Sequence, residues 1–184
     1  MRNSTSIIIV VIMLGVIVFS LVSPFMPQEE EQHQKDAKMP DKLHPVVEKK
    51  KNKLIRRAED KGINVVITEG FRSVEKQNEL YQQGRSDESN IVTNAKGGES
   101  YHNYGLAIDF ALKRKDDVIT WDLEYDGNNN GKSDWLEIVK IAKSLGFQWG
   151  GDWQHFKDYP HLQMDFGLTI RELQNGRWPP KEDA

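Results

Sequence analysis

The sequence predicts a small α+β domain with a central antiparallel sheet flanked by helices, and three observations support this fold class. Apolar residues recur at helical spacing in two separate stretches, residues 45–61 and 135–145. Short apolar runs such as Val65–Ile67 are typical of buried strands. Candidate helices and strands do not follow one another in the regular order of βαβ units, which disfavours a parallel sheet. With 184 residues, the chain is long enough for one such domain with additional segments at its ends.

The N-terminal residues 1–26 predict a transmembrane anchor. No charged residue occurs between positions 7 and 26, and a stretch of that length can cross a bilayer as a helix. An arginine precedes the stretch and three glutamates follow it, so the positive-inside bias places the rest of the chain outside the cell, as a single-pass protein of the cell membrane. The alternative is a secretory signal, with the protein exported. Residues 27–42 are polar and lack periodicity, as expected of a linker.

The predicted domain covers residues 43–168, and its first half contains two helices around a strand. Pro45 suits the first position of a helix, and Gly62 ends that helix. Ser73 caps the second helix, because its hydroxyl can accept a hydrogen bond from a backbone N–H of the first turn. The predicted elements are a helix over residues 45–61, a strand at 65–67 and a helix over 74–83.

The second half of the domain contains the clearest strand. From Leu106 to Leu112, apolar side chains alternate with Ala107, Asp109 and Ala111, so the two sets face opposite sides of a sheet. The remaining elements are a possible strand at residues 91–93, a helix over 135–145, and strands at 147–149 and 161–164. A C-terminal extension, residues 169–184, contains one further predicted helix over 169–175 and then a charged tail.

Composition excludes several classes of function. The formal net charge is −3, and no basic arm or interleaving of basic with aromatic residues is present, so we expect no nucleic-acid partner. We find no internal repeat and expect a monomer. The absence of cysteine excludes disulfides, thiolate nucleophiles and zinc–thiolate sites. A metal site in this chain must therefore use His, Asp or Glu.

Three residues form the strongest candidate for a metal site. Asp109 lies on the face of its strand opposite the apolar row, beside the small side chains of Ala107 and Ala111. Burying this carboxylate without a cation or hydrogen-bond donors would cost free energy. If the polar faces of the two strands meet, His102, Asp109 and His161 supply two nitrogens and one oxygen, the ligand set of a catalytic zinc ion. Each residue alone also has an ordinary structural interpretation, since most single histidines are hydrogen-bonded structural residues.

Two further residues are candidates for catalysis beside this metal set. Asp158 precedes His161 by three residues, and Pro160 bends the chain between them, so the carboxylate can return toward the metal as a general base. Arg72 follows the strand at Val65 and can balance the charge of an oxyanion. Taken singly, Asp158 fits a solvated loop position and Arg72 fits a surface ion pair.

A second metal-like motif runs from residue 126 to residue 137. Oxygen-bearing side chains stand at positions one, three, five, nine and twelve of a calcium loop, with glycine at position six. The alternative is an Asn/Gly turn in which Asp134 caps the following helix. The candidate calcium ligands are Asp126, Asn128, Asn130, Asp134 and Glu137.

Several separated motifs resemble those of one enzyme group, the LAS metallopeptidases, which include the VanY-like carboxypeptidases. Residues 100–109 are similar to the Ser-x-His-x-x-Gly-x-Ala-x-Asp signature of that group, and Asp158-Tyr159-Pro160-His161 resembles its acid-x-x-His element. Residues 70–73, followed by Gln77 and Leu80, resemble its arginine-containing segment. Residues 97–100, before His102, and residues 147–153, before His161, are most similar to the corresponding motifs of the peptidoglycan L-alanyl-D-glutamate endopeptidases. The resemblance covers residues 43–166 and leaves the C-terminal extension unexplained.

The resemblance implies a zinc-dependent enzyme that cleaves the L-Ala-D-Glu bond of cell-wall stem peptides. It implies that His102, Asp109 and His161 bind one zinc ion, that Asp158 is the general base, and that Arg72 stabilises charge. The protein would then work at the membrane or, if secreted, in the cell wall. The alternatives are a D-Ala-D-Ala carboxypeptidase, a wall-binding module without catalysis, and a domain in which zinc is purely structural. The residues expected to contact the wall peptide are Gln77, Ser100, Tyr104 and Trp149.

Overall fold

The structure, a computed structural model, describes residues 39–83, 85 and 91–180. All the described residues belong to one compact unit. Its helices and strands follow one another in the order α3 (Pro45–Glu59), β1 (Val65–Glu69), α4 (Val74–Gln82), η1 (Tyr101–Tyr104), β2 (Ala107–Lys113), β3 (Ile119–Thr120), α5 (Asp134–Ser144), β4 (Gln148–Trp149), η2 (Gly150–Asp152), β5 (His161–Gln163) and α6 (Ile170–Gln174).

The strands form one antiparallel sheet in the order β1-β2-β5-β4, with β3 also paired to β2. Strand β2 is the centre of the sheet because β1, β3 and β5 all pair with it. The register places Asp109 of β2 directly opposite His161 of β5. On the other side of β2 the register with β1 shifts between Ile67 and Glu69, so that Glu69 lies opposite Asp109. A bulge of this kind re-aims side chains at a sheet position.

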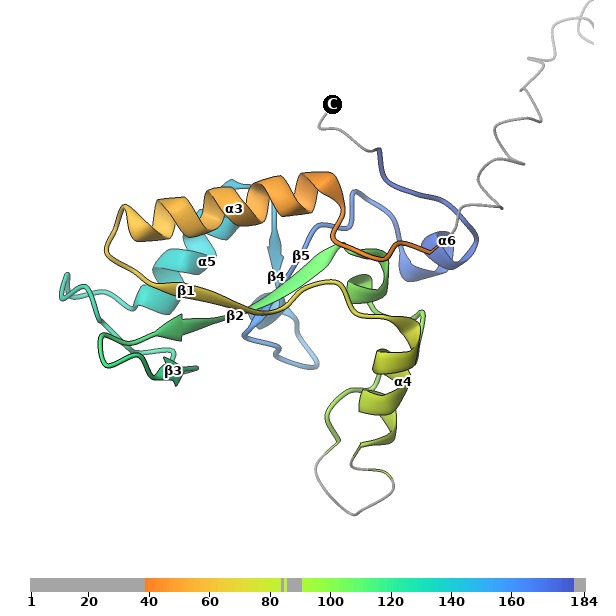
Figure 1. Cartoon of the computed structure of the whole chain (residues 1–184), viewed down its shortest axis with the longest axis horizontal. Helices are drawn as coiled ribbons and strands as arrows, with labels where there is room; N and C mark the ends of the chain where they lie inside the picture. The colour runs from red at the N-terminus through yellow and green to blue at the C-terminus, as the bar shows by residue number, and fades with distance from the viewer. Residues whose placement is uncertain (1–38, 84, 86–90, 181–184) are drawn as a thin grey trace, which may run out of the picture. The chain divides into compact units, whose positions relative to one another are not determined.

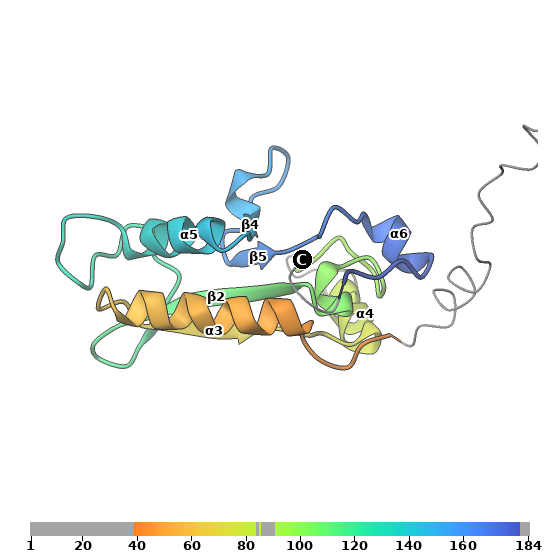
Figure 2. The ribbon, with the colours of Figure 1, turned by 90° about the horizontal axis from the view of Figure 1, so that it is seen from above.

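Helices α3 and α5 pack side by side on one face of the sheet (Figure 1, Figure 2). The apolar row of β2 faces these helices. The ring of Phe110 in β2 packs against that of Trp135 in α5, with 4.4 Å between the ring centroids. This burial of apolar surface is the main stabilising contribution to the fold. The polar residue Asp109 therefore lies on the opposite face, away from the helices, as the alternation of the sequence predicts.

One glycine, Gly105, determines how the chain leaves η1. Gly105 follows that short helix with φ +66°, a left-handed conformation that disfavours other residues. A Cβ atom there would lie 2.4 Å from the backbone oxygen of Lys42. The close approach lets the Gly105 carbonyl accept a hydrogen bond from the backbone N–H of His44, which anchors the start of α3. The turn that carries His102 is thus attached to the helical layer.

The predicted fold class is confirmed, and most predicted elements are present within two residues of their expected ends. Residues 91–93, considered as a strand, form a loop, because no neighbouring strand pairs with them among the described residues. The helix after the 126–134 loop is capped by Ser133 rather than Asp134: the Ser133 hydroxyl accepts from the backbone N–H of Leu136. The sequence did not predict η1, β3 or η2, which have four residues or fewer.

The predicted single-pass placement in the cell membrane is corrected. Within residues 39–83, 85 and 91–180, no helix combines the length and the apolar character that crossing a bilayer requires. The stretch behind the prediction, residues 1–26, lies outside the described residues. An uncharged apolar run meets the hydropathy requirement for a span, but hydropathy does not by itself establish that a spanning helix forms.

Candidate active site

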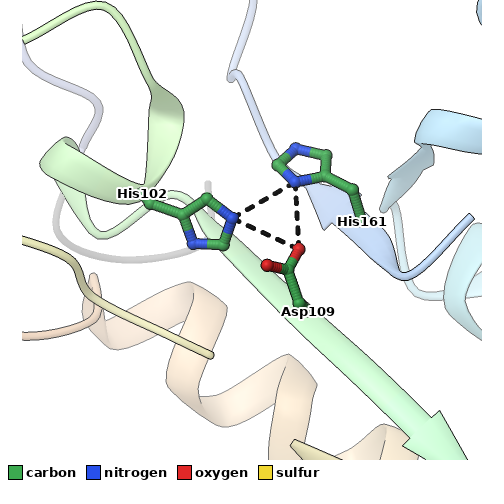
Figure 3. Close-up of side chains that lie close together, drawn as sticks. All are labelled: His102, Asp109 and His161. Atoms are coloured by element: carbon green, nitrogen blue, oxygen red, sulfur yellow. Dashed lines mark hydrogen bonds and ion pairs between the residues drawn. The ribbon is translucent and has the colours of Figure 1, made fainter. Parts of the chain in front are cut away.

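His102, Asp109 and His161 come together on the face of the sheet that α3 and α5 leave open (Figure 3). Asp109 and His161 are brought together by the pairing of β2 with β5, and η1 carries His102 over them. The His102 Nε2 atom lies 3.2 Å from His161 Nδ1 and 3.3 Å from Asp109 Oδ1. The third side of this triangle, from His161 Nδ1 to Asp109 Oδ1, is 3.2 Å. Both histidines are almost fully buried.

Hydrogen bonds on the outer side of each imidazole determine where its proton lies. His102 Nδ1 is 2.7 Å from the carbonyl oxygen of Gly70, which can only accept, so Nδ1 carries the proton. His161 Nε2 is 3.0 Å from Gln163 Oε1, and the amide of Gln163 is oriented by its donation to Gln148 Oε1. Each neutral imidazole therefore directs the lone pair of its other nitrogen toward Asp109.

These three donor atoms fit a zinc ion. Two nitrogen lone pairs and a carboxylate oxygen converge on one point, and this arrangement is repulsive unless a cation lies among them. Zinc bonds of about 2.0–2.2 Å at tetrahedral angles separate neighbouring donors by about 3.3 Å. The observed separations of 3.2, 3.2 and 3.3 Å agree with that value. The histidines also have the outer hydrogen bonds that orient metal ligands in proteins.

Asp109 stays ionised in this setting. The positive charge of Arg72 beside it favours the ionised form of its carboxyl. Its second oxygen, Oδ2, lies 3.5 Å from a guanidinium nitrogen of Arg72. The carboxylate can therefore give one oxygen to a metal while the other faces a fixed positive charge.

Arg72 is held in place by residues of β1 and α4. Its Nε donates to Glu69 at 3.2 Å, and one terminal nitrogen donates to Gln77 Oε1 at 2.9 Å. The amide of Gln77 also donates to the carbonyl of Ala95 at 2.8 Å, and the Gln77 side chain is fully buried. Together with the Asp109 contact, these bonds occupy three of the five N–H groups of a guanidinium. The other two have no partner among the described residues and remain for a ligand.

Asp158 lies beside the metal cluster on the segment that leads into β5. The backbone of Gly150 packs so closely here that a Cβ atom would lie 2.3 Å from the Asp158 carbonyl oxygen. That carbonyl also accepts from the backbone N–H of His161, which closes the turn containing Pro160. Burial raises the pKa of the Asp158 carboxyl above its ordinary value, and the charge of Asp109 adds to this, while the charge of Arg72 opposes it. The sequence predicted such a returning turn.

All of these groups open into one cavity of about 710 Å³. Arg72, the metal cluster and Asp158 lie on its polar side. Its apolar lining comes from segments far apart in the chain: Leu80, Val92, Tyr101, Trp153, Phe156 and Ile170. A cavity of this size with a few converging polar groups is typical of a binding site. It can hold several residues of an extended peptide.

The four side chains predicted to contact substrate occupy different positions relative to this cavity. Ser100 lines it, and its hydroxyl also caps η1 by accepting from the backbone N–H of His102. Gln77, Tyr104 and Trp149 lie outside the lining formed by the described residues. Tyr104 donates its hydroxyl to the carbonyl of Gly98, and Trp149 donates its indole N–H to the carbonyl of Tyr159. Gln77 reaches the site through Arg72.

Sequence reasoning did not assign a role to several residues that shape the site. Gln163 orients His161. The sequence contained one indication of this contact, because Gln163 stands two positions after His161 and therefore on the same face of the strand. Gly70 contributes only its carbonyl oxygen, which contacts His102 from 32 positions away. Every residue has such a carbonyl, so the residue type at position 70 gives no indication of the contact. Phe156 and Ile170 line the cavity from segments without a strong apolar period.

The loop at 126–137 does not gather its carboxylates. Among the described residues, His102, Asp109 and His161 form the one group of three or more His, Asp or Glu donors close enough to hold an ion. Asp126 accepts hydrogen bonds from the backbone N–H groups of Asn130 and Gly131. Glu137 accepts from the side-chain amides of Asn128 and Asn130, and from Lys61. The predicted calcium site therefore has no support, and the loop is an Asn/Gly turn held by its own polar groups.

Comparisons with known proteins agree with this geometry. A family profile described as D-alanyl-D-alanine carboxypeptidase matches residues 93–164. The chain is 67% identical over 129 residues to the peptidoglycan L-alanyl-D-glutamate endopeptidase CwlK of Bacillus subtilis (strain 168), covering 70% of this chain and 77% of CwlK. It is 37% identical over 114 residues to an L-alanyl-D-glutamate peptidase of Listeria phage A118, covering 62% of this chain and 35% of that protein.

A solved structure shares the fold. It is the L,D-carboxypeptidase DacB of Streptococcus pneumoniae, with a TM-score of 0.51 and 22% identity, covering 76% of this chain and 73% of DacB. The antiparallel sheet and the buried His–Asp–His cluster on its open face define a VanY-like metallopeptidase. Within that class, the chain belongs to the family of the endopeptidase CwlK.

Proposed function

We propose that this protein is a zinc-dependent endopeptidase that cleaves the L-Ala-D-Glu bond of peptidoglycan stem peptides. The convergence of two unprotonated imidazole nitrogens and one ionised carboxylate at the base of a cavity supports this proposal most strongly. A structural zinc site is usually closed by four protein ligands, whereas a catalytic site keeps three and leaves a position for water. The cluster offers three donors and opens into the cavity, which favours catalysis over a purely structural metal or a binding module.

His102 Nε2, His161 Nδ1 and Asp109 Oδ1 would hold the ion. Zinc, when bound, supplies a Lewis acid that polarises the scissile carbonyl and makes a water molecule acidic enough to attack near neutral pH. Asp158 faces the same cavity and would accept the proton of the attacking water. The same carboxyl would then deliver that proton to the nitrogen of the scissile peptide bond, so that the leaving group departs as a neutral amine and not as an anion.

Arg72 would stabilise the negative charge that develops on the carbonyl oxygen. Arg72 lines the cavity, and its hydrogen bonds to Glu69 and Gln77 hold the guanidinium in place. Preorganised donors of this kind lose little free energy in reorganisation during the reaction. Ser100 lies in the lining and would contact the peptide, whereas Gln77, Tyr104 and Trp149 would act through the residues they hold.

The assignment of the bond follows from the relatives rather than from the cavity. Both curated relatives are described as acting between L-alanine and D-glutamate. The family profile and the solved structure are described as carboxypeptidases, and therefore removal of a terminal D-alanine is the second candidate. The two candidates release different products.

The test is a digest of purified wall peptides by the zinc-loaded full chain, analysed by mass spectrometry. We expect new peptides with N-terminal D-glutamate. Release of free D-alanine would instead identify a carboxypeptidase, and no cleavage with zinc bound would contradict the proposal. The Asp158→Asn variant should bind zinc but lose about 10²–10⁴-fold in kcat. His155→Ala is a matched control, because His155 is an exposed histidine outside the cluster.

A further inference from the structure

The C-terminal segment, defined here as residues 165–180, lies beyond the family profile, which ends at residue 164. The chain reverses direction at Phe166 and Gly167, which have φ values of +53° and +75°. A left-handed phenylalanine is uncommon and costs free energy, so other contacts must hold the reversal in place. One such contact is the packing of the Phe166 ring on His44, with 5.2 Å between ring centroids.

The segment is then fastened to residues 98–104, the stretch that carries His102. Tyr101 donates its hydroxyl to the carbonyl of Leu168 at 2.8 Å. Gln174 donates its amide to the carbonyl of Gly98 at 3.0 Å, and the Trp178 ring packs on Tyr104 with 5.7 Å between centroids.

Apolar burial and a capping box complete the attachment. Leu168 and Leu173 belong to the apolar core, with exposed fractions of 9% and 2%. Thr169 caps α6: its hydroxyl accepts from the backbone N–H of Glu172, whose carboxylate in turn accepts from the backbone N–H of Thr169. This reciprocal arrangement stabilises the first turn of a short helix that would not form alone.

Ile170 is the residue that this attachment presents to the active-site cavity. It lies between the two buried leucines, and its side chain is half-buried and lines the cavity together with Tyr101 and His102. A half-buried isoleucine beside a catalytic centre leaves apolar surface to be covered by a ligand. Because Leu168 and Leu173 hold α6 on both sides, the position of Ile170 is fixed before a ligand binds, which lowers the entropic cost of binding.

We propose that Ile170 is a specificity-determining residue, and that the C-terminal segment is part of the substrate site. In this proposal, which rests on the proposed function, the Ile170 side chain packs against an aliphatic part of the bound wall peptide. It selects against a charged group at that position, because an unpaired charge in contact with isoleucine would lose its hydration.

The test compares variants at Ile170 with a control on the same helix. Ile170→Ala removes the apolar contact, Ile170→Glu adds a charge, and Ile170→Val keeps most of the contact. Arg171→Ala is the control, because Arg171 is the adjacent, exposed residue of α6. For each zinc-loaded full-length protein, kcat and KM are measured on a purified wall peptide. The Kd for the same peptide is measured by calorimetry with the Asp158→Asn substitution added to prevent cleavage.

We expect Ile170→Ala to raise KM and Kd about five- to tenfold with kcat changed less than about twofold. Ile170→Glu should raise both further, while Ile170→Val and Arg171→Ala stay near wild type. Equal loss of kcat in all Ile170 variants together with loss of zinc would indicate a structural role and overturn the proposal. Unchanged KM and Kd in Ile170→Ala would also overturn it.

The calorimetric measurement separates this proposal from the proposed function. If the wild-type chain cleaves no wall peptide, the proposed function fails, but Kd still reports whether Ile170 contacts the peptide. If the wild type neither cleaves nor binds, both proposals fail. If the wild type cleaves normally and Ile170→Ala and Ile170→Glu match it in KM and Kd, the proposed function stands and the inference about the C-terminal segment is wrong.

Discussion

At the scale of single residues, the site depends on the positions of two protons. The carbonyl of Gly70 holds one on His102 Nδ1, and Gln163 holds the other on His161 Nε2. With the protons placed there, both remaining nitrogens are ready to bind a metal without first changing tautomer. The residues that orient the imidazoles therefore contribute to metal affinity even though they do not touch the metal.

Gln163 gives a direct test of this role. Gln163→Leu removes the acceptor for His161 Nε2–H, leaves the tautomer free and should weaken zinc binding about 10- to 100-fold. The affinity is measured by competition with a chelator of known zinc affinity. Gln163→Glu keeps an acceptor at the same position and serves as the control. Wild-type affinity in the leucine variant would show that His161 is oriented by other contacts.

Asp134 has a predictable effect on stability at the scale of one carboxyl group. Burial raises its pKa, and the charges of Asp126 and Glu137 add to this, while hydrogen bonds from backbone N–H groups oppose it. The folded state therefore holds this proton more tightly than the unfolded chain does. The stabilising contribution of the protonated group is present at low pH and is lost as the pH rises through the folded-state pKa.

The measurement is the difference in Tm between wild type and Asp134→Asn as a function of pH, in metal-free buffer. Asparagine does not titrate and can still accept from the Gly127 N–H, to which Asp134 Oδ2 is bonded at 2.9 Å. We expect the wild type to lose stability relative to the variant as the pH rises above about 4, the ordinary pKa of an aspartate. A difference that stays constant, or changes in the opposite direction, would contradict a raised pKa.

At the scale of elements, Gln77 connects three parts of the fold. From α4 it accepts from Arg72, which follows β1, and donates to Ala95 in the loop before η1. Gln77→Leu leaves a guanidinium N–H and a carbonyl without this partner. We expect a loss of about 1–3 kcal/mol in the free energy of unfolding, measured in denaturant, and a lower kcat because Arg72 is less well positioned.

A matched variant separates the two effects of Gln77. Gln77→Glu keeps the acceptor for Arg72 but loses the donor to the Ala95 carbonyl. It should retain more kcat than Gln77→Leu even if its stability is also reduced. Equal kcat in the two variants would show that the bond to Arg72 does not position the guanidinium for catalysis.

The elements also show which structural features the sequence can predict. The alternation around Ile108 and Phe110 predicts β2 and the outward face of Asp109, because successive side chains of a strand point to opposite faces of the sheet. The partners of Arg72 could not be predicted, since they depend on the register shift between Ile67 and Glu69. Short elements such as η1 contain too few residues to establish a period, although one of them carries His102.

For the molecule as a whole, the ligand set was predictable and the surrounding cavity was not. Residue types and the resemblance to a known enzyme group together pointed to His102, Asp109 and His161, and the structure brings these three donors close enough to hold an ion. The cavity walls come from separate regions, including Val92, Phe156 and Ile170, and become neighbours only through tertiary packing. The residues of the C-terminal segment carried no motif, and their proximity to the cavity follows from the reversal after β5.

The same convergence of donors predicts that zinc binding stabilises the whole domain. Without the ion, two lone pairs and a carboxylate lie within 3.3 Å of one another in a buried setting, and binding removes this repulsion. At a free zinc concentration about 100-fold above Kd, the gain is about 2.7 kcal/mol, which raises Tm by on the order of 10 °C. Scanning calorimetry with and without a chelator measures the shift.

Two variants test whether this cluster is the source of the stabilisation. His102→Ala should lose most of the zinc-dependent rise in Tm, whereas His155→Ala should keep it. A full zinc response in His102→Ala would place the bound ion elsewhere in the chain, and the proposed catalytic centre would have to be abandoned.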